Sequence, residues 1–275
     1  MNSVTGLGSG LMGGPTSDFE RDTLSTAGDD SRLLVTSPHW RIGENENGGY
    51  VTAIVARAMS EAGAHPDPLS VTTHFLRPVA GDAEANVETE LVRTGRTLTT
   101  WRGRLSHGGK QRVEVLAGFG ELGERSGTEW EPAAPVIAAP NDCLHRSSLE
   151  QGIDLPILAR TDVRIDPANA VAGTADEAVV NGWIRFTDGA EPDPLALLVF
   201  ADAFPPSTFP RRGFSGWVPT IELTVHVRKR PAPGWIQARF ECDDLSDGRL
   251  VESGTLWDST GAVVARSRQL GLLLE

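Results

Sequence analysis

An apolar stripe at helical spacing marks the first half of the chain, between residues 50 and 63. Apolar side chains that recur every three or four positions share one face of a helix, and Gly63 is a suitable helix end. Residues 39–42 read as a short extended segment before this helix, and residues 45–49 as a turn. The stripe consists of Val51, Ile54, Val55, Ala58 and Met59.

Extended segments separated by glycine-rich turns follow the helix, as β-hairpins require. The second half repeats this order, with a strand at 178–189 and then a helix. Asp193 is expected to cap that helix with Pro194 at its first position, and Pro205-Pro206 to end it. The remaining predicted strands are 69–78, 83–95, 98–109 and 110–121 in the first half, and 220–230, 235–245, 249–259 and 262–275 in the second.

The two halves also match each other in register. When the chain is shifted by 153 positions, Arg77-Pro78 falls on Arg230-Pro231 and Gly95-Arg96 falls on Gly248-Arg249 without a gap. Two unrelated strands with similar turns would give a weaker version of the same match. We interpret the pattern as a duplicated domain.

A helix whose stripe is this apolar must be buried, and a curved antiparallel sheet wrapped around it can bury it. The predicted fold is therefore α+β, with two tandem units that each wrap a curved antiparallel sheet around a central helix. Pairing of the two sheet edges would also remove exposed edge strands. The expected segments are a flexible N-terminal tail at 1–30, a first unit at 31–121, a Pro- and Ala-rich connection at 122–177 and a second unit at 178–275.

The net charge, the apolar runs and the cysteines limit the possible binding partners and the cellular compartment. The 275 residues carry a net charge of −12, and this charge repels the phosphates of nucleic acid. No apolar run approaches the ~20 residues that span a bilayer, and the start of the chain lacks the pattern of a signal peptide. Cys143 and Cys242 show neither metal nor disulfide spacing, so we expect reduced thiols in a cytoplasmic protein.

The first residues contain a formal dinucleotide-binding match, Gly8-Ser9-Gly10-Leu11-Met12-Gly13. That motif works only where a strand enters the glycine loop and a helix leaves it. No strand-like segment precedes this match, and Pro15 follows it, so we assign the match to the tail.

One carboxylate interrupts the apolar stripe of the second helix. Asp202 follows Leu198 and Val199 at helical spacing, so it is predicted to face the sheet. Burial of a carboxylate is costly unless it is hydrogen-bonded, and burial raises its pKa, which makes Asp202 a functional candidate. The alternative is that Asp202 lies at the helix end and reaches solvent or a backbone amide.

Two further polar residues occur only in the second half. Thr220 opens a strand where the first half has Pro68-Leu69, and Gln269 lies in the last strand where the first half has Leu116. A threonine suits any strand and a single glutamine is usually exposed, so each residue alone is ordinary. Their joint presence in one half favours a site that only the second half supplies.

Several segments resemble the acyl-CoA thioesterase II family, whose chains are two fused hot-dog domains. They are "GGYVTAIVARAM" at the first helix, "FLRP" and "NVETELVRTGRT" in the following strands, and "QLGLLLE" at the C-terminal end. The resemblance covers about residues 40–121 and 180–275. It departs from the family pattern at Thr72, where the family has His, and at Glu222-Leu223, where the family has Asp-His.

The resemblance implies a hydrolytic water held by Asp202, Thr220 and Gln269, with an acyl-CoA as substrate and without a metal or cofactor. For the oxyanion we expect the backbone amides of Gly48, Gly49 and Tyr50 at a helix start, where free N–H groups converge. Clusters of basic side chains are candidates for the phosphates of coenzyme A. These clusters are Arg211-Arg212 and Arg228-Lys229-Arg230.

Other functions remain as alternatives. A covalent serine hydrolase needs a G-x-S-x-G elbow, which the residues around Ser215 do not form. A dehydratase needs an acid–histidine pair, for which Asp142 and His145 are poorly placed. A non-catalytic acyl-CoA-binding protein with a decayed site is the alternative from a different functional class. Fused hot-dog chains often associate, so we also expect a homodimer.

Overall fold

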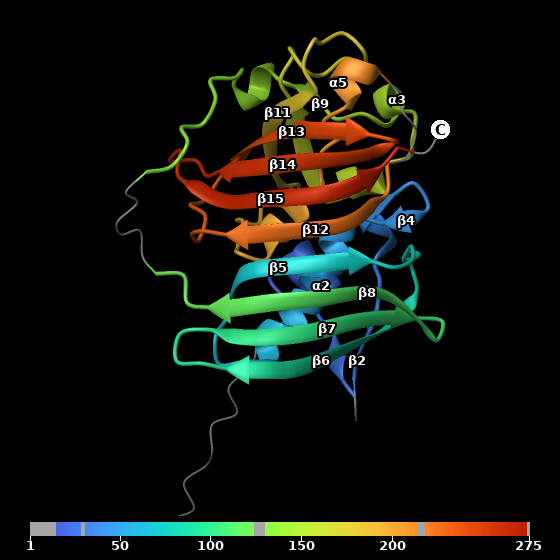
Figure 1. The fold of residues 1–275 in the computed structure, drawn as a ribbon, viewed down its shortest axis with the longest axis vertical. Helices are drawn as coiled ribbons and strands as arrows, with labels where there is room; N and C mark the ends of the chain where they lie inside the picture. The colour runs from blue at the N-terminus through green and yellow to red at the C-terminus, as the bar shows by residue number, and fades with distance from the viewer. Residues whose placement is uncertain (1–14, 29–30, 124–129, 214–217, 274–275) are drawn as a thin grey trace, which may run out of the picture.

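One thirteen-stranded antiparallel sheet runs through the molecule in the computed structural model (Figure 1). The structure describes residues 15–28, 31–123, 130–213 and 218–273. Near the middle of the sheet, β5 (Asp67–Phe75) pairs with β12 (Thr220–Val227). The chain therefore joins the edges of two smaller sheets, as the sequence predicts.

The two halves of the sheet have the same strand order, mirrored across the β5–β12 seam. We call β2, β6, β7, β8 and β5 with their helix the N-terminal unit, and β11, β13, β14, β15 and β12 with theirs the C-terminal unit. β5 and β12 begin 153 positions apart, as do β8 and β15. The bounds are β2 (Arg32–Val35), β6 (Glu84–Thr94), β7 (Thr99–His107), β8 (Lys110–Gly120), β11 (Val179–Phe186), β13 (Ile236–Ser246), β14 (Arg249–Trp257) and β15 (Val263–Leu272).

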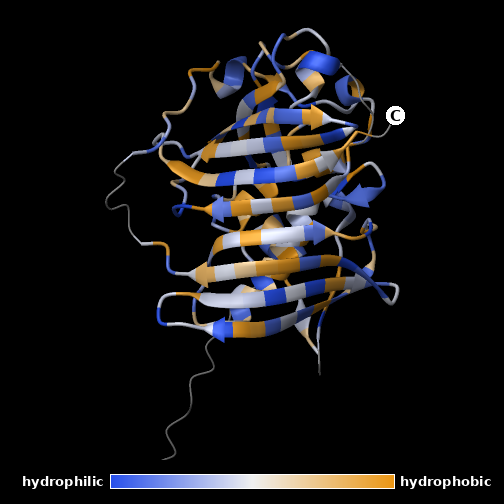
Figure 2. Ribbon diagram, viewed as in Figure 1, coloured by the Kyte–Doolittle hydropathy of each residue, from blue (hydrophilic) through white to orange (hydrophobic). Residues whose placement is uncertain are grey.

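Each unit encloses a helix, and the two helices touch. In the N-terminal unit α2 (Gly48–Ala62) carries the predicted apolar stripe, and Gly63 ends it. Most of its residues are buried, and along the strands apolar and polar residues alternate (Figure 2). Alternation lets one sheet face cover the helix while the other meets water. The double hot-dog α+β fold is confirmed.

The helix of the C-terminal unit is shorter than the sequence predicts. The Asp193 Oδ1 accepts from Ala196 N at 2.6 Å, but α4 (Ala196–Phe200) has only five residues, and its N-cap is Leu195 rather than Asp193. Asp202 therefore lies in the turn beyond the helix. The nearby Pro205 and Pro206 disfavour continued helix, and the Asp202 carbonyl instead accepts from the Asn47 side chain at 2.7 Å.

The opening strand of the N-terminal unit differs from the prediction. β2 pairs with β6, whereas residues 38–42 form a 3₁₀ turn, η1 (Pro38–Trp40), and the short strand β3 (Arg41–Ile42). β3 pairs with β4 (Asn45–Glu46) in a separate hairpin. The alternation signal is missing in β2 because its outward Leu33 and Val35 are apolar too.

Part of the segment expected to be a tail is folded onto the core. α1 (Asp18–Thr23) begins at a Ser17 cap, and β1 (Thr26–Ala27) pairs with β2. Phe19 is 3% exposed and stacks on Phe186 at 5.1 Å between ring centroids. Because α1 is otherwise polar, its sequence shows too little apolar periodicity to predict a helix. The dinucleotide-like match at residues 8–13 lies outside the described residues.

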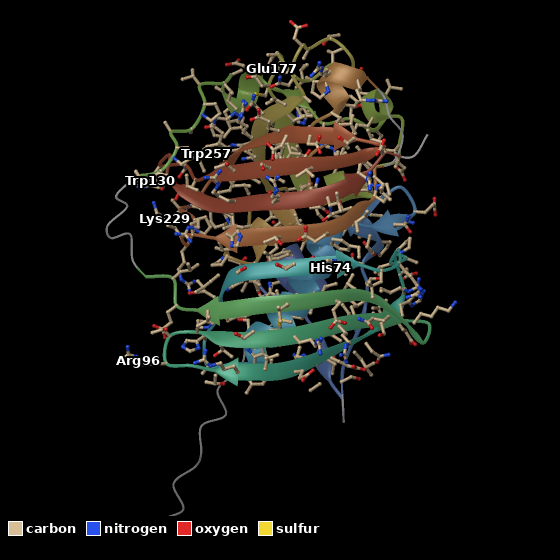
Figure 3. All side chains as sticks on the ribbon, in the orientation of Figure 1. His74, Arg96, Trp130, Glu177, Lys229 and Trp257 are labelled. Atoms are coloured by element: carbon tan, nitrogen blue, oxygen red, sulfur yellow. The ribbon has the colours of Figure 1, made fainter. Side chains whose placement is uncertain are left out.

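The connection between the units is tied to the C-terminal unit. The carbonyl of Pro132 accepts from Trp257 Nε1 at 2.9 Å, and Glu131 forms an ion pair with Lys229, beside Trp130 in Figure 3. β10 (Thr161–Ile165) pairs with β11 and extends the sheet. The other short elements are η2 (Pro140–Asp142), β9 (Leu144–His145), α3 (Ser148–Gln151), η3 (Pro156–Ala159) and, further on, α5 (Phe209–Arg212).

Three observations concern membrane crossing, metal binding and the cysteines. None of the helices in the described part of the chain has the length and hydropathy that a bilayer crossing requires. Within those same residues, no cluster of three or more His, Cys, Asp or Glu side chains is placed to hold a metal ion. Cys143 and Cys242 are both free thiols.

The contact between α2 and α4 predicts a strict size limit at Gly49. A Cβ there would lie 2.5 Å from the Leu198 carbonyl oxygen and 2.9 Å from Val199 Cα. We expect Gly49→Ala to lower the free energy of unfolding by about 1–3 kcal/mol, because this overlap outweighs the ~1 kcal/mol that alanine gains in a helix. Urea denaturation measures the change, with Gly123→Ala as control, since a Cβ at Gly123 meets nothing within 4 Å. An unchanged midpoint for Gly49→Ala would contradict the close helix contact.

Candidate active site

A pocket of about 310 Å³ opens where the end of β5 meets the start of β12, so both units contribute to its walls. Its wall is mostly apolar, and its exposed rim includes Leu76, Arg77 and Pro78. The polar residues that line it are Asn45, Glu46, Asn47, Arg77, Arg146, Gln151, Asp202, Thr220, Glu252 and Gln269.

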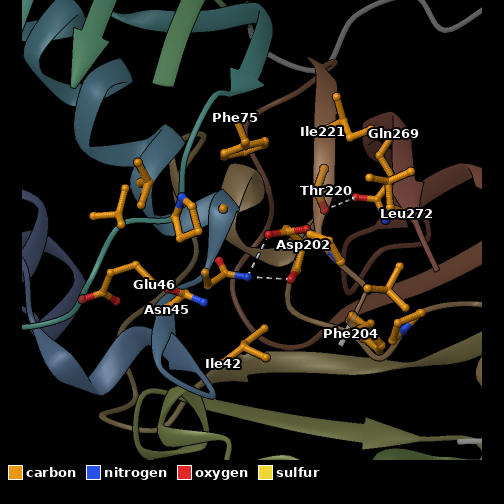
Figure 4. A pocket seen from close by; sticks show the side chains of 18 of the residues that line it. Ile42, Asn45, Glu46, Phe75, Asp202, Phe204, Thr220, Ile221, Gln269 and Leu272 are labelled. Atoms are coloured by element: carbon orange, nitrogen blue, oxygen red, sulfur yellow. Dashed lines mark hydrogen bonds between the residues drawn. The ribbon is translucent and has the colours of Figure 1, made fainter. Parts of the chain in front are cut away.

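Asp202 lies against the N-terminus of α2, which belongs to the other unit (Figure 4). Its Oδ2 accepts from Gly49 N at 2.9 Å and from Asn47 Nδ2 at 2.8 Å. The free N–H groups and the positive end of a helix dipole favour a carboxylate at this place. Both sequence interpretations are partly right, since Asp202 follows the helix end and meets a backbone amide, yet it lines the pocket.

The two glycines before Tyr50 are required for this approach. A Cβ on Gly48 would lie 3.0 Å from Asp202 Oδ2 and 2.8 Å from Phe75 Cζ. The amides expected to bind an oxyanion are already engaged, however. Gly49 N donates to Asp202 Oδ2, the Gly48 amide is close enough to lower the pKa of Asp202, and Tyr50 N donates to Asn47 Oδ1 at 2.9 Å. In this structure these amides fix the carboxylate and its neighbour.

Tyr50 itself supports the fold. Its ring stacks on Trp40 at 5.2 Å, and its hydroxyl donates to the Asp22 carbonyl at 2.7 Å. The side chain is fully buried and is not part of the described pocket wall. Only its backbone amide belongs to the surroundings of Asp202.

Thr220 and Gln269 are neighbours on the C-terminal side of the same pocket, as Figure 4 shows. The Thr220 hydroxyl donates to Gln269 Oε1 at 3.3 Å. The amide nitrogen of Gln269 donates to Glu252 Oε1 at 2.7 Å. The three residues singled out from the sequence thus line one cavity.

The sequence pattern sets Gln269 against Leu116 of the first half, but these two positions are not equivalent in the structure. Leu116 is 56% exposed on the outer face of β8, whereas Gln269 faces inward from β15. Each of the pairings β7–β8 and β14–β15 skips one residue, Arg112 in β8 and Val264 in β15, and these two residues are 152 rather than 153 positions apart. A shift of one residue moves a side chain to the other sheet face.

Three residues of the site escaped the sequence analysis: Asn47, Arg146 and Glu252. An asparagine directly before a helix is a known cap signal, so Asn47 could have been found. Glu252 stands among inward apolar residues of its strand, which also marks it as unusual. Arg146 lies in the Pro-rich connection and carries no such signal. In the structure it is 4% exposed and donates to the Ala203 carbonyl and to Gln151 Oε1.

Burial dominates the electrostatics of the pocket. Desolvation raises the pKa of Asp202 to about 6, although Gly49, Arg146, Gly48 and Asn47 each lower it. Desolvation likewise raises the pKa of Glu252 to about 7 and of Glu46 to about 8. It lowers the pKa of Arg146 to about 9, so this side chain is a cation at neutral pH. Asp202 is then mostly ionised and faces a buried positive charge.

The basic clusters predicted to bind phosphate lie outside this pocket. Arg211 and Arg212 are exposed on α5 and are not part of the described pocket wall. Lys229 and Arg230 form ion pairs with Glu131 and Asp67. Arg77 was not among the predicted phosphate ligands. It lies on the exposed rim of the pocket, and its Nη1 donates to the Gln111 carbonyl at 3.0 Å.

The departures from the family pattern also lie away from the described pocket wall. The Thr72 and Thr224 hydroxyls are 2.9 Å apart across the β5–β12 seam, and Thr224 donates to Glu222 Oε1. Leu223 is fully buried in the sheet beside Gln269. These substitutions therefore alter the seam rather than the groups around Asp202.

The residues of the alternative dehydratase site lie apart from this pocket. His145 Nδ1 is 3.5 Å from Asp162 Oδ1, and neither Asp142 nor His145 belongs to the wall of the pocket as described. Ser215 lies outside the described residues.

The raised pKa predicts that Asp202 destabilises the folded chain when ionised. Its pKa rises from 3.8 to about 6 on folding, so its stabilising contribution is complete below pH ~4 and is lost as pH rises through ~6. We expect Asp202→Asn to raise the free energy of unfolding at pH 8 by about 1–3 kcal/mol and to flatten its pH dependence between pH 4 and 6. Urea denaturation across this range tests both effects, with Asp142→Asn as control. A less stable Asp202→Asn variant with unchanged pH dependence would refute the assignment.

Comparison with known proteins identifies the family. Residues 36–120 match the acyl-CoA thioesterase N-terminal domain, and residues 138–273 match the acyl-CoA thioesterase C-terminal domain. A proposed thioesterase II from Thermobifida fusca is 30% identical, with a TM-score of 0.86 over 95% of this chain and 99% of that one.

Two further relatives agree with this match. A protein of unknown function with a hot-dog fold, from Alicyclobacillus acidocaldarius, shares the fold with a TM-score of 0.82 at 20% identity, over 94% and 99% of the two chains. An uncharacterized Mycobacterium tuberculosis protein is 29% identical over 86% of this chain and 88% of its own. With both family domains matched in order over a double hot-dog fold, the chain belongs to the acyl-CoA thioesterase family of thioester hydrolases.

Proposed function

We propose that this protein hydrolyses acyl-CoA thioesters to a free acid and coenzyme A, with a water molecule held by Asp202, Thr220 and Gln269. The observation that carries the proposal is the common pocket of the three side chains, in which Asp202 is the ionisable group at the start of α2. The family membership supports the reaction class, and the pocket geometry supports the residues.

In this mechanism the water attacks the thioester carbonyl carbon while Asp202 takes its proton. A pKa of about 6 leaves Asp202 ionised at neutral pH and keeps it more basic than an ordinary aspartate. Thr220 and Gln269 fix the position of the water. The carbon–sulfur bond then breaks, and the coenzyme A thiolate takes the proton from Asp202. A thiolate is a good leaving group, so no separate strong acid is required.

The negative charge that develops on the carbonyl oxygen needs a positive partner. The amides of Gly48 and Gly49 at the start of α2 were assigned to this role from the sequence, but here they bind Asp202. We propose that they mainly hold the carboxylate in place, and that Arg146 supplies the positive charge. Its fixed guanidinium lines the pocket and is already close enough to lower the pKa of Asp202.

A non-catalytic acyl-CoA-binding protein remains the alternative, because the chain departs from the family pattern at the seam.

In the hydrolytic proposal the apolar wall takes the acyl chain, and a cytoplasmic homodimer is the expected form. For the phosphates of coenzyme A, Arg77 on the pocket rim now stands beside the Arg211-Arg212 pair as a candidate.

The proposal predicts thiol release from a panel of acyl-CoA thioesters of increasing chain length, followed with a thiol reagent. We expect Asp202→Asn to lower kcat by about 100-fold, because general bases contribute at least that much. In the wild type, kcat/KM should fall on acidification with a midpoint near pH 6, as Asp202 takes up a proton. Thr220→Ala and Gln269→Ala should each lower kcat, whereas Asp142→Asn in the connection should not.

The two functions give opposite results in this assay. Tight acyl-CoA binding without thiol release by the wild type would support the binding protein. Full activity of Thr220→Ala and Gln269→Ala would show that the residue assignment is wrong even if hydrolysis occurs.

The phosphate site can be located with two thioesters of the same acyl group, of which only the acyl-CoA carries phosphates. We expect Arg77→Ala to raise KM about tenfold for an acyl-CoA, the size of one lost charge-assisted hydrogen bond, and to leave KM unchanged for the matching N-acetylcysteamine thioester. The Arg211→Ala/Arg212→Ala variant tests the other cluster in the same way, and Arg96→Ala serves as control. Equal KM changes for both thioesters would exclude a phosphate contact for the residue tested.

A further inference from the structure

Glu252 is a buried carboxylate that touches the proposed catalytic machinery without belonging to it. It lies in β14 with 4% of its surface exposed and is the direct cross-strand partner of Gln269 in β15. It lines the same pocket as Asp202 and Thr220. A carboxylate in such a place needs hydrogen-bond donors, because burial without them is costly.

Both oxygens of Glu252 have a donor. Oε1 accepts from Gln269 Nε2 at 2.7 Å, and Oε2 accepts from the backbone N–H of Ser207 at 2.7 Å. Ser207 lies five residues beyond Asp202 in the segment that follows α4. Glu252 thus connects the inner face of the sheet to the segment that carries Asp202.

We propose that Glu252 is a positioning residue, which sets the orientation of the Gln269 amide and through it the direction of the Thr220 hydroxyl. This inference rests on the proposed hydrolysis and assigns Glu252 no contact with substrate.

Above its pKa of about 7, Glu252 is mainly ionised. An ionised carboxylate only accepts hydrogen bonds, so it selects the amide nitrogen of Gln269. The amide oxygen then points to Thr220, whose hydroxyl donates to it at 3.3 Å. Thr220 therefore turns oxygen lone pairs, rather than a hydrogen, towards the pocket.

This orientation suits a water nucleophile. One hydrogen of the water can bind Asp202 and the other can bind the Thr220 oxygen, so both lone pairs of the water remain free for the carbonyl carbon. With the Gln269 amide reversed, its nitrogen would donate to Thr220, and the Thr220 hydroxyl would donate to the water instead. That bond would occupy one of the two lone pairs of the water and draw electron density from its oxygen, which makes the water a weaker nucleophile.

The test is a double-mutant cycle on the full-length protein with the best acyl-CoA of the panel. We expect Glu252→Gln to lower kcat by about 10- to 100-fold with little change in KM, the range typical of losing an outer partner that orients an essential side chain. In a Gln269→Ala background the same substitution should lower kcat less than about twofold, because the residue it orients is gone.

Two controls separate a loss of positioning from a folding defect or a nonspecific effect of removing a carboxylate. Glu241→Gln removes an exposed carboxylate from the neighbouring strand and should leave kcat unchanged. If Glu252→Gln does not fold, Glu252→Asp retains the charge but shortens the reach, and it should show the same kcat loss and the same dependence on Gln269.

The outcomes are distinct. Additive losses in the double variant, or full activity of Glu252→Gln, would overturn the role of Glu252 and leave the hydrolysis proposal intact. Absence of thiol release by the wild type with every acyl-CoA would instead overturn the hydrolysis on which the inference rests.

Discussion

The contact between the Asp202 carboxylate and the first turn of α2 holds the site together. The carboxylate comes from the C-terminal unit, and the amides and the Asn47 side chain that bind it come from the N-terminal unit. Neither unit alone contains the pocket, because its walls include residues of both. The pocket therefore requires both units, and their pairing also covers sheet edges.

That contact places conditions on the rest of the chain. The glycines at 48 and 49 must stay small, since a Cβ on either would press on Asp202 or on α4. α4 must end early, so that the chain can turn and bring Asp202 to the helix start. The β5–β12 pairing fixes the two units at the distance at which these groups meet.

The pocket also concentrates charge in a poorly solvated place. Asp202, Glu252 and Glu46 all have raised pKa values because of burial, and Arg146 has a lowered one for the same reason. Glu46 lacks any hydrogen-bond partner for its carboxyl oxygens among the residues described. Such groups destabilise the fold locally, and the large apolar core around both helices offsets this effect.

The sequence alone determined the features that depend on local pattern. The stripe of α2, the strands, the tandem repeat and the carboxylate at Asp202 were all predictable, because periodicity and a polar interruption are visible without neighbours. The same reasoning missed β2 and α1, where the apolar contacts are too few or lie on both faces. It also compared Gln269 with Leu116, since a register shift between paired strands leaves no mark on the sequence.

Only the tertiary structure decided which groups meet. Long-range contacts brought Arg146 from the connection, Glu252 from a neighbouring strand and Asn47 from the other unit to the same carboxylate environment. They also showed that two of the amides assigned to an oxyanion already have partners, since Gly49 N donates to Asp202 and Tyr50 N donates to Asn47. Hydrogen-bond partners and desolvation depend on distances across the fold, and spacing along the chain carries no information about those distances.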